Sequence, residues 1–235
     1  MHFRASQTSE SLELALILAL SGGLMDAYSY LGRDGVFANA QTGNLLLLGV
    51  NISTGNWDVV AHYLCPVVAF ACGCALAHLV KLHQTPGMHW RQYVLLVEAA
   101  LLLIVSTMGS DLNLVANSLT SLACGMQVQA FRKLHGRSFA TTMCIGNLRS
   151  GTQALVTYFD SRERVHLRTA GLYYGVVATF VLGAVLGNWV LGFAGLHTIR
   201  VSCVLLVAAF ALMFYDRERR ARERAERSGA DTDIA

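Results

Sequence analysis

Uncharged apolar stretches alternate with short polar stretches along most of the chain. Eight apolar stretches are long enough to be examined as membrane segments, at 12–31, 35–52, 61–82, 93–109, 112–131, 139–158, 169–189 and 196–215. A helix needs about 20 apolar residues to cross roughly 30 Å of hydrocarbon, and these stretches come close to that length. The pattern therefore predicts an all-α, polytopic membrane protein.

The placement of Lys and Arg decides how many stretches cross. If all eight crossed, the basic residues within 132–137 and those within 162–168 would lie on opposite sides, against the cytoplasmic preference of Lys and Arg. The conflict disappears if 35–52 and 139–158 enter the membrane and return on the same side. We therefore favour about six transmembrane helices plus two re-entrant or broken segments over eight full spans, with both termini in the cytoplasm. Arg33 is then one of the few charged residues in the outer loops.

The second half of the chain repeats features of the first. The tripeptide Gly-Asn-Leu at 43–45 recurs at 146–148, and the same spacing pairs Gly22 with Gly125. Further along the chain, Gly73 in the first half corresponds to Gly183 in the second. Three spans and one re-entrant segment per half would give the halves opposite orientations, which is the inverted repeat found in many transporters. The alternative is an old duplication retained only for packing.

These boundaries divide the chain into four regions. They are a cytoplasmic N-terminus (1–11), a first membrane repeat (12–109), a second membrane repeat (110–215) and a basic cytoplasmic tail (216–235). Two such repeats, embedded in a lipid bilayer, predict an integral membrane protein.

Composition narrows the functional classes. The chain is 54% hydrophobic and only 14% charged, which leaves too few charges to cover a soluble globule. The net charge of +3 gives no reason to expect a nucleic-acid partner. Its six cysteines lie in apolar stretches without zinc-ligand spacing, and no catalytic or nucleotide-binding motif is present. We expect no metal, no cofactor and no enzymatic activity; the oligomeric state is left open, a homo-oligomer included.

The two re-entrant segments carry polar side chains in apolar surroundings. The first contains Asn39, Gln41, Thr42 and Asn44, and the second contains Thr142, Asn147 and Arg149. If each segment breaks at its Gly-Asn pair, two half-helix N-termini would meet near the middle of the membrane, where they favour anions. Arg149 would strengthen that preference. The alternative is a pair of polar helix-packing motifs.

Acidic residues inside apolar stretches are functional candidates by default. Asp26 follows a run of small residues in the first stretch. Glu98 lies about five residues from the cytoplasmic end of the fourth, near enough to snorkel or to meet Arg91. The repeat pairs Asp26 with Gln129, with Gln127 close by, so the second half offers amides and no acid. We rank Asp26 first, as a proton or cation site; the alternatives are that it pairs with Arg149 or caps a broken helix.

Several motifs resemble one known family. They are Gly-Gly-Leu-Met-Asp at 22–26, Gly-Val-Phe-Ala-Asn-Ala-Gln-Thr-Gly-Asn at 35–44, Gly-Met-Gln at 125–127 and Ala-Thr-Thr at 140–142. Together they look like the YoaK family of bacterial membrane proteins of unknown function. The resemblance implies a small polytopic inner-membrane protein and names no substrate.

We therefore expect a transporter or channel for a small solute, with an anion as the first candidate. The site would comprise Asp26, Asn39, Gln41, Thr42, Asn44, Gln127, Thr142, Asn147 and Arg149. The alternatives are a non-transporting membrane scaffold and, with less support, a lipid-modifying enzyme.

Overall fold

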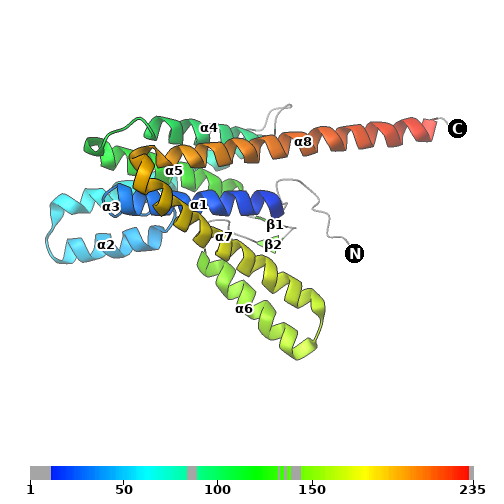
Figure 1. Cartoon of the computed structure of the whole chain (residues 1–235), viewed down its shortest axis with the longest axis horizontal. Helices are drawn as coiled ribbons and strands as arrows, with labels where there is room; N and C mark the ends of the chain where they lie inside the picture. Colours follow the sequence, from blue (N-terminus) through cyan, green and yellow to red (C-terminus); the bar gives the residue numbers. More distant parts are fainter. Residues whose placement is uncertain (1–11, 84–88, 132, 135–136, 139–143, 233–235) are drawn as a thin grey trace.

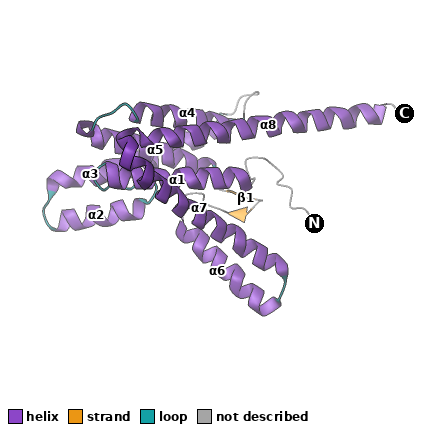
Figure 2. Ribbon diagram, viewed as in Figure 1, coloured by secondary structure: helices purple, strands orange, loops and turns teal. Residues whose placement is uncertain are grey.

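The computed structural model describes residues 12–83, 89–131, 133–134, 137–138 and 144–232, and is built almost entirely of helices (Figures 1 and 2). The helices are α1 (Leu12–Gly32), α2 (Gln41–Ser53), α3 (Trp57–Leu82), α4 (Trp90–Val105), α5 (Asn113–Ala130), α6 (Cys144–Ser161), α7 (Arg164–Ala194) and α8 (Ile199–Thr232), with 3₁₀ turns η2 (Ser110–Leu112) and η3 (Gly195–Thr198). The all-α prediction is confirmed, with one small departure. Two-residue strands β1 (Lys133–Leu134) and β2 (Arg137–Ser138) pair antiparallel between α5 and α6.

Three helical stretches of the described chain are long and apolar enough to cross a membrane. They are Leu12–Gly32, Trp57–Leu82 and Arg164–Tyr215, the last of which contains both α7 and the first half of α8. Helix α4 has 16 residues and α5 has 18, so each extends only about 24–27 Å. Length and composition therefore identify a helical membrane protein, and do not by themselves give six spans.

Large apolar side chains face outward over the surface of these helices. Trp189 and Phe193 of α7 are 70% and 71% exposed, and Val181, Leu182 and Val185 are exposed on the same helix. A soluble monomer rarely exposes so much contiguous apolar surface. The surface of α7 is therefore suited to lipid.

Two helix pairs join the halves of the chain. Helix α1 packs along α7, and α3 packs along α5. At each crossing the backbones approach so closely that a Cβ atom on the glycine would collide with a carbonyl oxygen of the partner helix. The four contacts are Gly23 with Phe180, Gly183 with Leu20, Gly125 with Phe70 and Gly73 with Leu122. Small residues allow this approach, which increases van der Waals contact between helices in lipid.

A sharp turn after α1 sends the chain back into the bundle. Asp34 and Gly35 both have positive φ angles, of 63° and 75°. The returning segment runs beside α1: the Gly35 N–H donates to the Tyr30 carbonyl, and the Asn39 N–H reaches the Asp26 side chain. Helix α2 therefore begins beside Asp26, which lies six residues, or roughly 9 Å, before the C-terminal end of α1. With 13 residues, α2 is too short to cross a membrane.

The close contact at Gly183 gives a direct test of this packing. Substitution Gly183→Ala should lower the free energy of unfolding by about 1–3 kcal/mol, because the new methyl group meets backbone rather than a movable side chain. Gly192→Ala on the same helix is the matched control, since nothing lies near its Cβ position. Ala should stabilise the helix there by up to about 1 kcal/mol. Thermal unfolding in detergent would measure both, and equal effects would contradict the close crossing.

Candidate functional site

A cavity of about 770 Å³ lies where the first turns of α2 and α6 approach the middle of α1. Its walls come from α1, from the segment before α2, from both first turns, and from single phenylalanines of α3 and α7. The lining residues are Asp26, Ala27, Tyr30, Leu31, Phe37, Asn39, Ala40, Gln41, Thr42, Phe70, Cys144, Ile145, Gly146, Phe180 and Ala184. Neither helix breaks at its Gly-Asn pair, because α2 begins at Gln41, α6 is described from Cys144, and each runs through that pair. The first turns of both segments nevertheless contribute to one cavity.

The Asp26 carboxylate lies at the N-terminus of α2. It is 8% exposed, and its Oδ1 accepts a hydrogen bond of 2.7 Å from the backbone N–H of Asn39. The backbone amides of Ala38 and Ala40 also act on this carboxylate. The free N–H groups at a helix start carry partial positive charge, which stabilises an anion. Asp26 therefore supplies the anion that this half-helix would otherwise bind.

The other polar side chains at the start of α2 mainly fix its geometry. Gln41 Nε2 donates to the Ala38 carbonyl at 2.8 Å and to Ser121 Oγ of α5 at 3.3 Å. Asn44 accepts from the Phe37 N–H and donates to the Phe37 carbonyl and to Gln41 Oε1. Asn44 is fully buried and does not line the cavity, whereas Gln41 and Thr42 do.

Four aromatic residues line the same cavity as Asp26. Tyr30 and Phe37 stack with their centroids 4.7 Å apart and their planes inclined by 19°. Phe70 and Phe180 lie in the wall on α3 and α7, and their carbonyl groups make the close contacts with Gly125 and Gly23. The helix crossings therefore fix the positions of two of the aromatic residues.

The second broken segment contributes less polarity than the sequence suggested. Cys144, Ile145 and Gly146 line the cavity, while Asn147 is 3% exposed and outside the lining. Arg149 is exposed and does not reach the cavity. Thr142 lies outside the described residues.

Gln127 of α5 is also separate from the cavity. It is buried, and its Nε2 donates to the Leu18 carbonyl at 3.3 Å. Of the nine expected site residues, the structure thus brings four together in the cavity wall: Asp26, Asn39, Gln41 and Thr42. No group of three or more His, Cys, Asp or Glu side chains suited to a metal occurs among the described residues.

Sequence reasoning missed a structural centre at Arg33, which it placed in an outer loop. Arg33 is fully buried, and its guanidinium makes five hydrogen bonds, matching its five N–H donors. The acceptors are Tyr28 Oη, Asn113 Oδ1 and the carbonyls of Val105, Met108 and Gly109. These carbonyls lie at the C-terminal end of α4, where the helix dipole favours a cation. Asn113 and Asn117, two amides four residues apart at the start of α5, were the available signal.

The network around Arg33 predicts an unequal response to substitution. Arg33→Lys should destabilise the protein by about 2–3 kcal/mol, because an ammonium group has three donors and leaves buried acceptors unpaired. Arg200→Lys is the control at the same end of the bundle, since Arg200 is exposed and donates from Nε to Ser106 Oγ. Thermal unfolding in detergent should show a large decrease in Tm only for Arg33→Lys. A normal Tm for that variant would contradict the five-bond arrangement.

Comparison with known proteins places the chain in a family. Residues 14–212 match the family model described as "Protein of unknown function (DUF1275)". The chain is also 26% identical over 182 residues to the UPF0700 transmembrane protein YoaK of Bacillus subtilis (strain 168), covering 74% of this chain and 80% of that protein. No solved structure matches. The expected resemblance to YoaK is thus confirmed, and the chain belongs to the DUF1275 family, as a membrane protein.

Proposed function

We propose that this protein is a permease, without enzymatic activity, that passes a small solute across the membrane through the cavity at Asp26. The observation that carries the proposal is the meeting of two helix starts, those of α2 and α6, in the wall of one cavity. Irregular backbone inside a membrane is tolerated where it is buried in protein or lines a water-filled space. Transporters commonly place such helix breaks around their substrate.

The proposed topology has six crossing helices, α1, α3, α4, α5, α7 and α8, and two re-entrant segments that contain α2 and α6. The support for this topology is that equivalent helices of the two halves make equivalent contacts, if α1–α4 correspond to α5–α8. Helix α1 packs on α7 as α5 packs on α3, α2 packs on α3 as α6 packs on α7, and α1 packs on α8 as α5 packs on α4. An inverted repeat accounts for all three pairs of contacts.

The glycine crossings support the same repeat and refine its alignment. Gly23 and Gly125 each meet the carbonyl group of a phenylalanine, while Gly73 and Gly183 each meet the carbonyl group of a leucine. Gly23 is therefore the better partner for Gly125 than Gly22, the residue paired with it by the Gly-Asn-Leu spacing. The pairing of Gly73 with Gly183 is unchanged.

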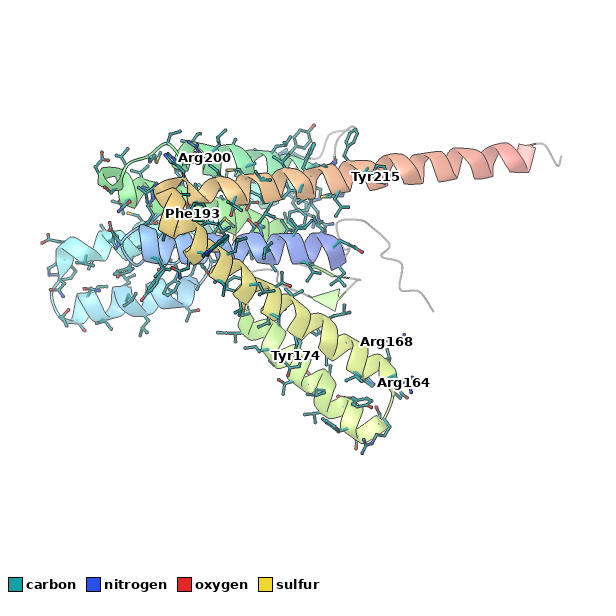
Figure 3. The ribbon with its side chains drawn as sticks, in the orientation of Figure 1. Arg164, Arg168, Tyr174, Phe193, Arg200 and Tyr215 are labelled. Atoms are coloured by element: carbon teal, nitrogen blue, oxygen red, sulfur yellow. The ribbon has the colours of Figure 1, made fainter. Side chains whose placement is uncertain are left out.

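The arrangement of helix ends supports cytoplasmic termini in a bacterial inner membrane. The start of α1 and the C-terminal end of α8 lie at one end of the bundle, and the α2–α3 turn lies at the other (Figure 1). Arg164 and Arg168 lie near the α6–α7 turn, at the opposite end of α7 from Phe193 (Figure 3). With the N-terminus inside, these arginines and the basic tail fall on the cytoplasmic side.

The charge of the cavity favours a neutral or cationic solute over the anion expected from the sequence. Asp26 is the only charged side chain among the described lining residues. Its carboxylate already accepts from the α2 backbone, and Arg149 is exposed elsewhere. Aromatic faces beside a carboxylate attract cations. We therefore propose an amine or a neutral polar compound as the solute.

Two native cysteines offer a matched test of a water-filled cavity. Cys144 lines the cavity, whereas Cys124 is fully buried in the core between α1 and α5. In an otherwise cysteine-free protein, a charged, membrane-impermeant thiol reagent should label Cys144 alone. Labelling would be followed by mass spectrometry in sealed vesicles. Protection of both cysteines would indicate a dry core and would favour the alternative, a scaffold whose polar residues only pack helices.

Solute charge can be tested by ligand-induced stabilisation of the purified protein. A compound present at 100 times its Kd stabilises the folded state by about 2.7 kcal/mol, which a thermal-shift screen detects. We expect hits among small amines and neutral polar compounds, and we expect Asp26→Asn to remove the shift given by amines. Asn keeps an oxygen that can accept from the Asn39 N–H, so the fold should persist. Stabilisation by anions alone, unchanged in Asp26→Asn, would contradict the proposed charge preference.

A further inference from the structure

A second acidic residue lies away from the cavity, in the core formed by α1, α4, α5 and α8. Glu98 of α4 is fully buried, at 0% exposure. Neither of its carboxylate oxygens has a hydrogen-bond partner within the described part of the chain. From the sequence we ranked Glu98 below Asp26 and expected that it could meet Arg91. In the structure Arg91 instead donates from Nε to the Ala130 carbonyl and lies over the Trp90 ring.

Within the described residues, the surroundings of Glu98 provide no compensating positive charge. The titratable groups that face it are the thiols of Cys124 on α5 and Cys203 on α8, both of which feel its charge. Arg200, the cation that acts on Cys203, is exposed, and its Nε donates to Ser106. An ionised carboxylate without a partner in such a core would cost many kcal/mol. A proton on Glu98 removes that cost.

Glu98 is nevertheless close to the cavity. The Cys124 thiol is within electrostatic range of both Glu98 and Asp26, and it lies beside the Asn39 side chain. Its sulfur is also 3.9 Å from the Met25 sulfur, one residue before Asp26. Cys124 is therefore near both acids. Asn39 Oδ1 and Gln127 Oε1 are buried without a partner among the described residues and can accept hydrogen bonds from water.

We propose that Glu98 is a proton-binding site within the membrane, which holds a proton at neutral pH and exchanges it, through Asp26, with water in the cavity. The inference rests on the proposed function only in that it needs a hydrated cavity. Two carboxyl groups, one at the cavity and one behind it, would couple solute movement to a proton, as intramembrane acids do in pumps and transporters.

Infrared spectroscopy of the full-length protein in lipid nanodiscs tests this directly, because a protonated carboxyl group has a C=O stretch distinct from that of a carboxylate. At neutral pH the wild type should show a protonated band that is lost in Glu98→Gln and kept in Asp26→Asn. In D₂O the wild-type band should shift. In Asp26→Asn that shift should slow by about tenfold or more, because the relaying group is gone.

Each other outcome would overturn the proposal. A protonated C=O band that is unchanged in Glu98→Gln would mean that Glu98 is ionised. A band that never shifts in D₂O would mean that the proton is sealed in the core, and an unchanged rate in Asp26→Asn would exclude exchange beside Asp26. The measurement needs no solute. If the Glu98 band shifts in D₂O but the solute screen finds nothing, the proton site is supported and the permease is not. If Cys144 is labelled but no Glu98 band is seen, the permease proposal is supported and the proton site is not.

Discussion

The close approach of helix backbones at four glycines is the constraint on which the rest of the structure depends. Each crossing brings a carbonyl group of one helix against the Cα of another, with α1 on α7 and α3 on α5. In lipid, apolar side chains gain little by leaving their surroundings, so such contact must hold the helices together. The same crossings place Phe70 and Phe180, whose rings line the cavity. Packing and site are therefore set by the same contacts.

Within this frame, the start of α2 shows how a helix can begin inside a membrane protein. Its free N–H groups need an acceptor, and no lipid can provide one. The chain supplies Asp26 from α1, and it supplies Asn44, which bridges the backbone of Phe37. The arrangement also determines the electrostatics of the cavity, because the positive end of the helix already faces a carboxylate. This is why a half-helix N-terminus, which alone favours anions, is compatible here with a neutral or cationic solute.

Two buried charged side chains, Arg33 and Glu98, illustrate opposite solutions to the same energetic problem. Arg33 satisfies all five of its donors at the end of α4 and so ties α1 to α4 and α5. Glu98 has no such partner in the described structure, and protonation is the remaining way to lower its cost. A satisfied buried charge serves the fold, whereas an unsatisfied one is a candidate for function.

The sequence by itself determined the membrane class, the helical fold and the family resemblance, because apolar length and short motifs are visible without any contacts. It singled out Asp26, which lies in the cavity wall. It also led to the pairing of α2 with α6 through their Gly-Asn motifs. Only the tertiary structure decided which polar residues meet. Arg149 and Asn147 are outside the cavity wall, Arg33 is in the core rather than in a loop, and Glu98 lacks the neighbour it was expected to reach. The reason is physical: helical periodicity shows that a residue lies on a helix, but the crossing of backbones selects the face that is buried.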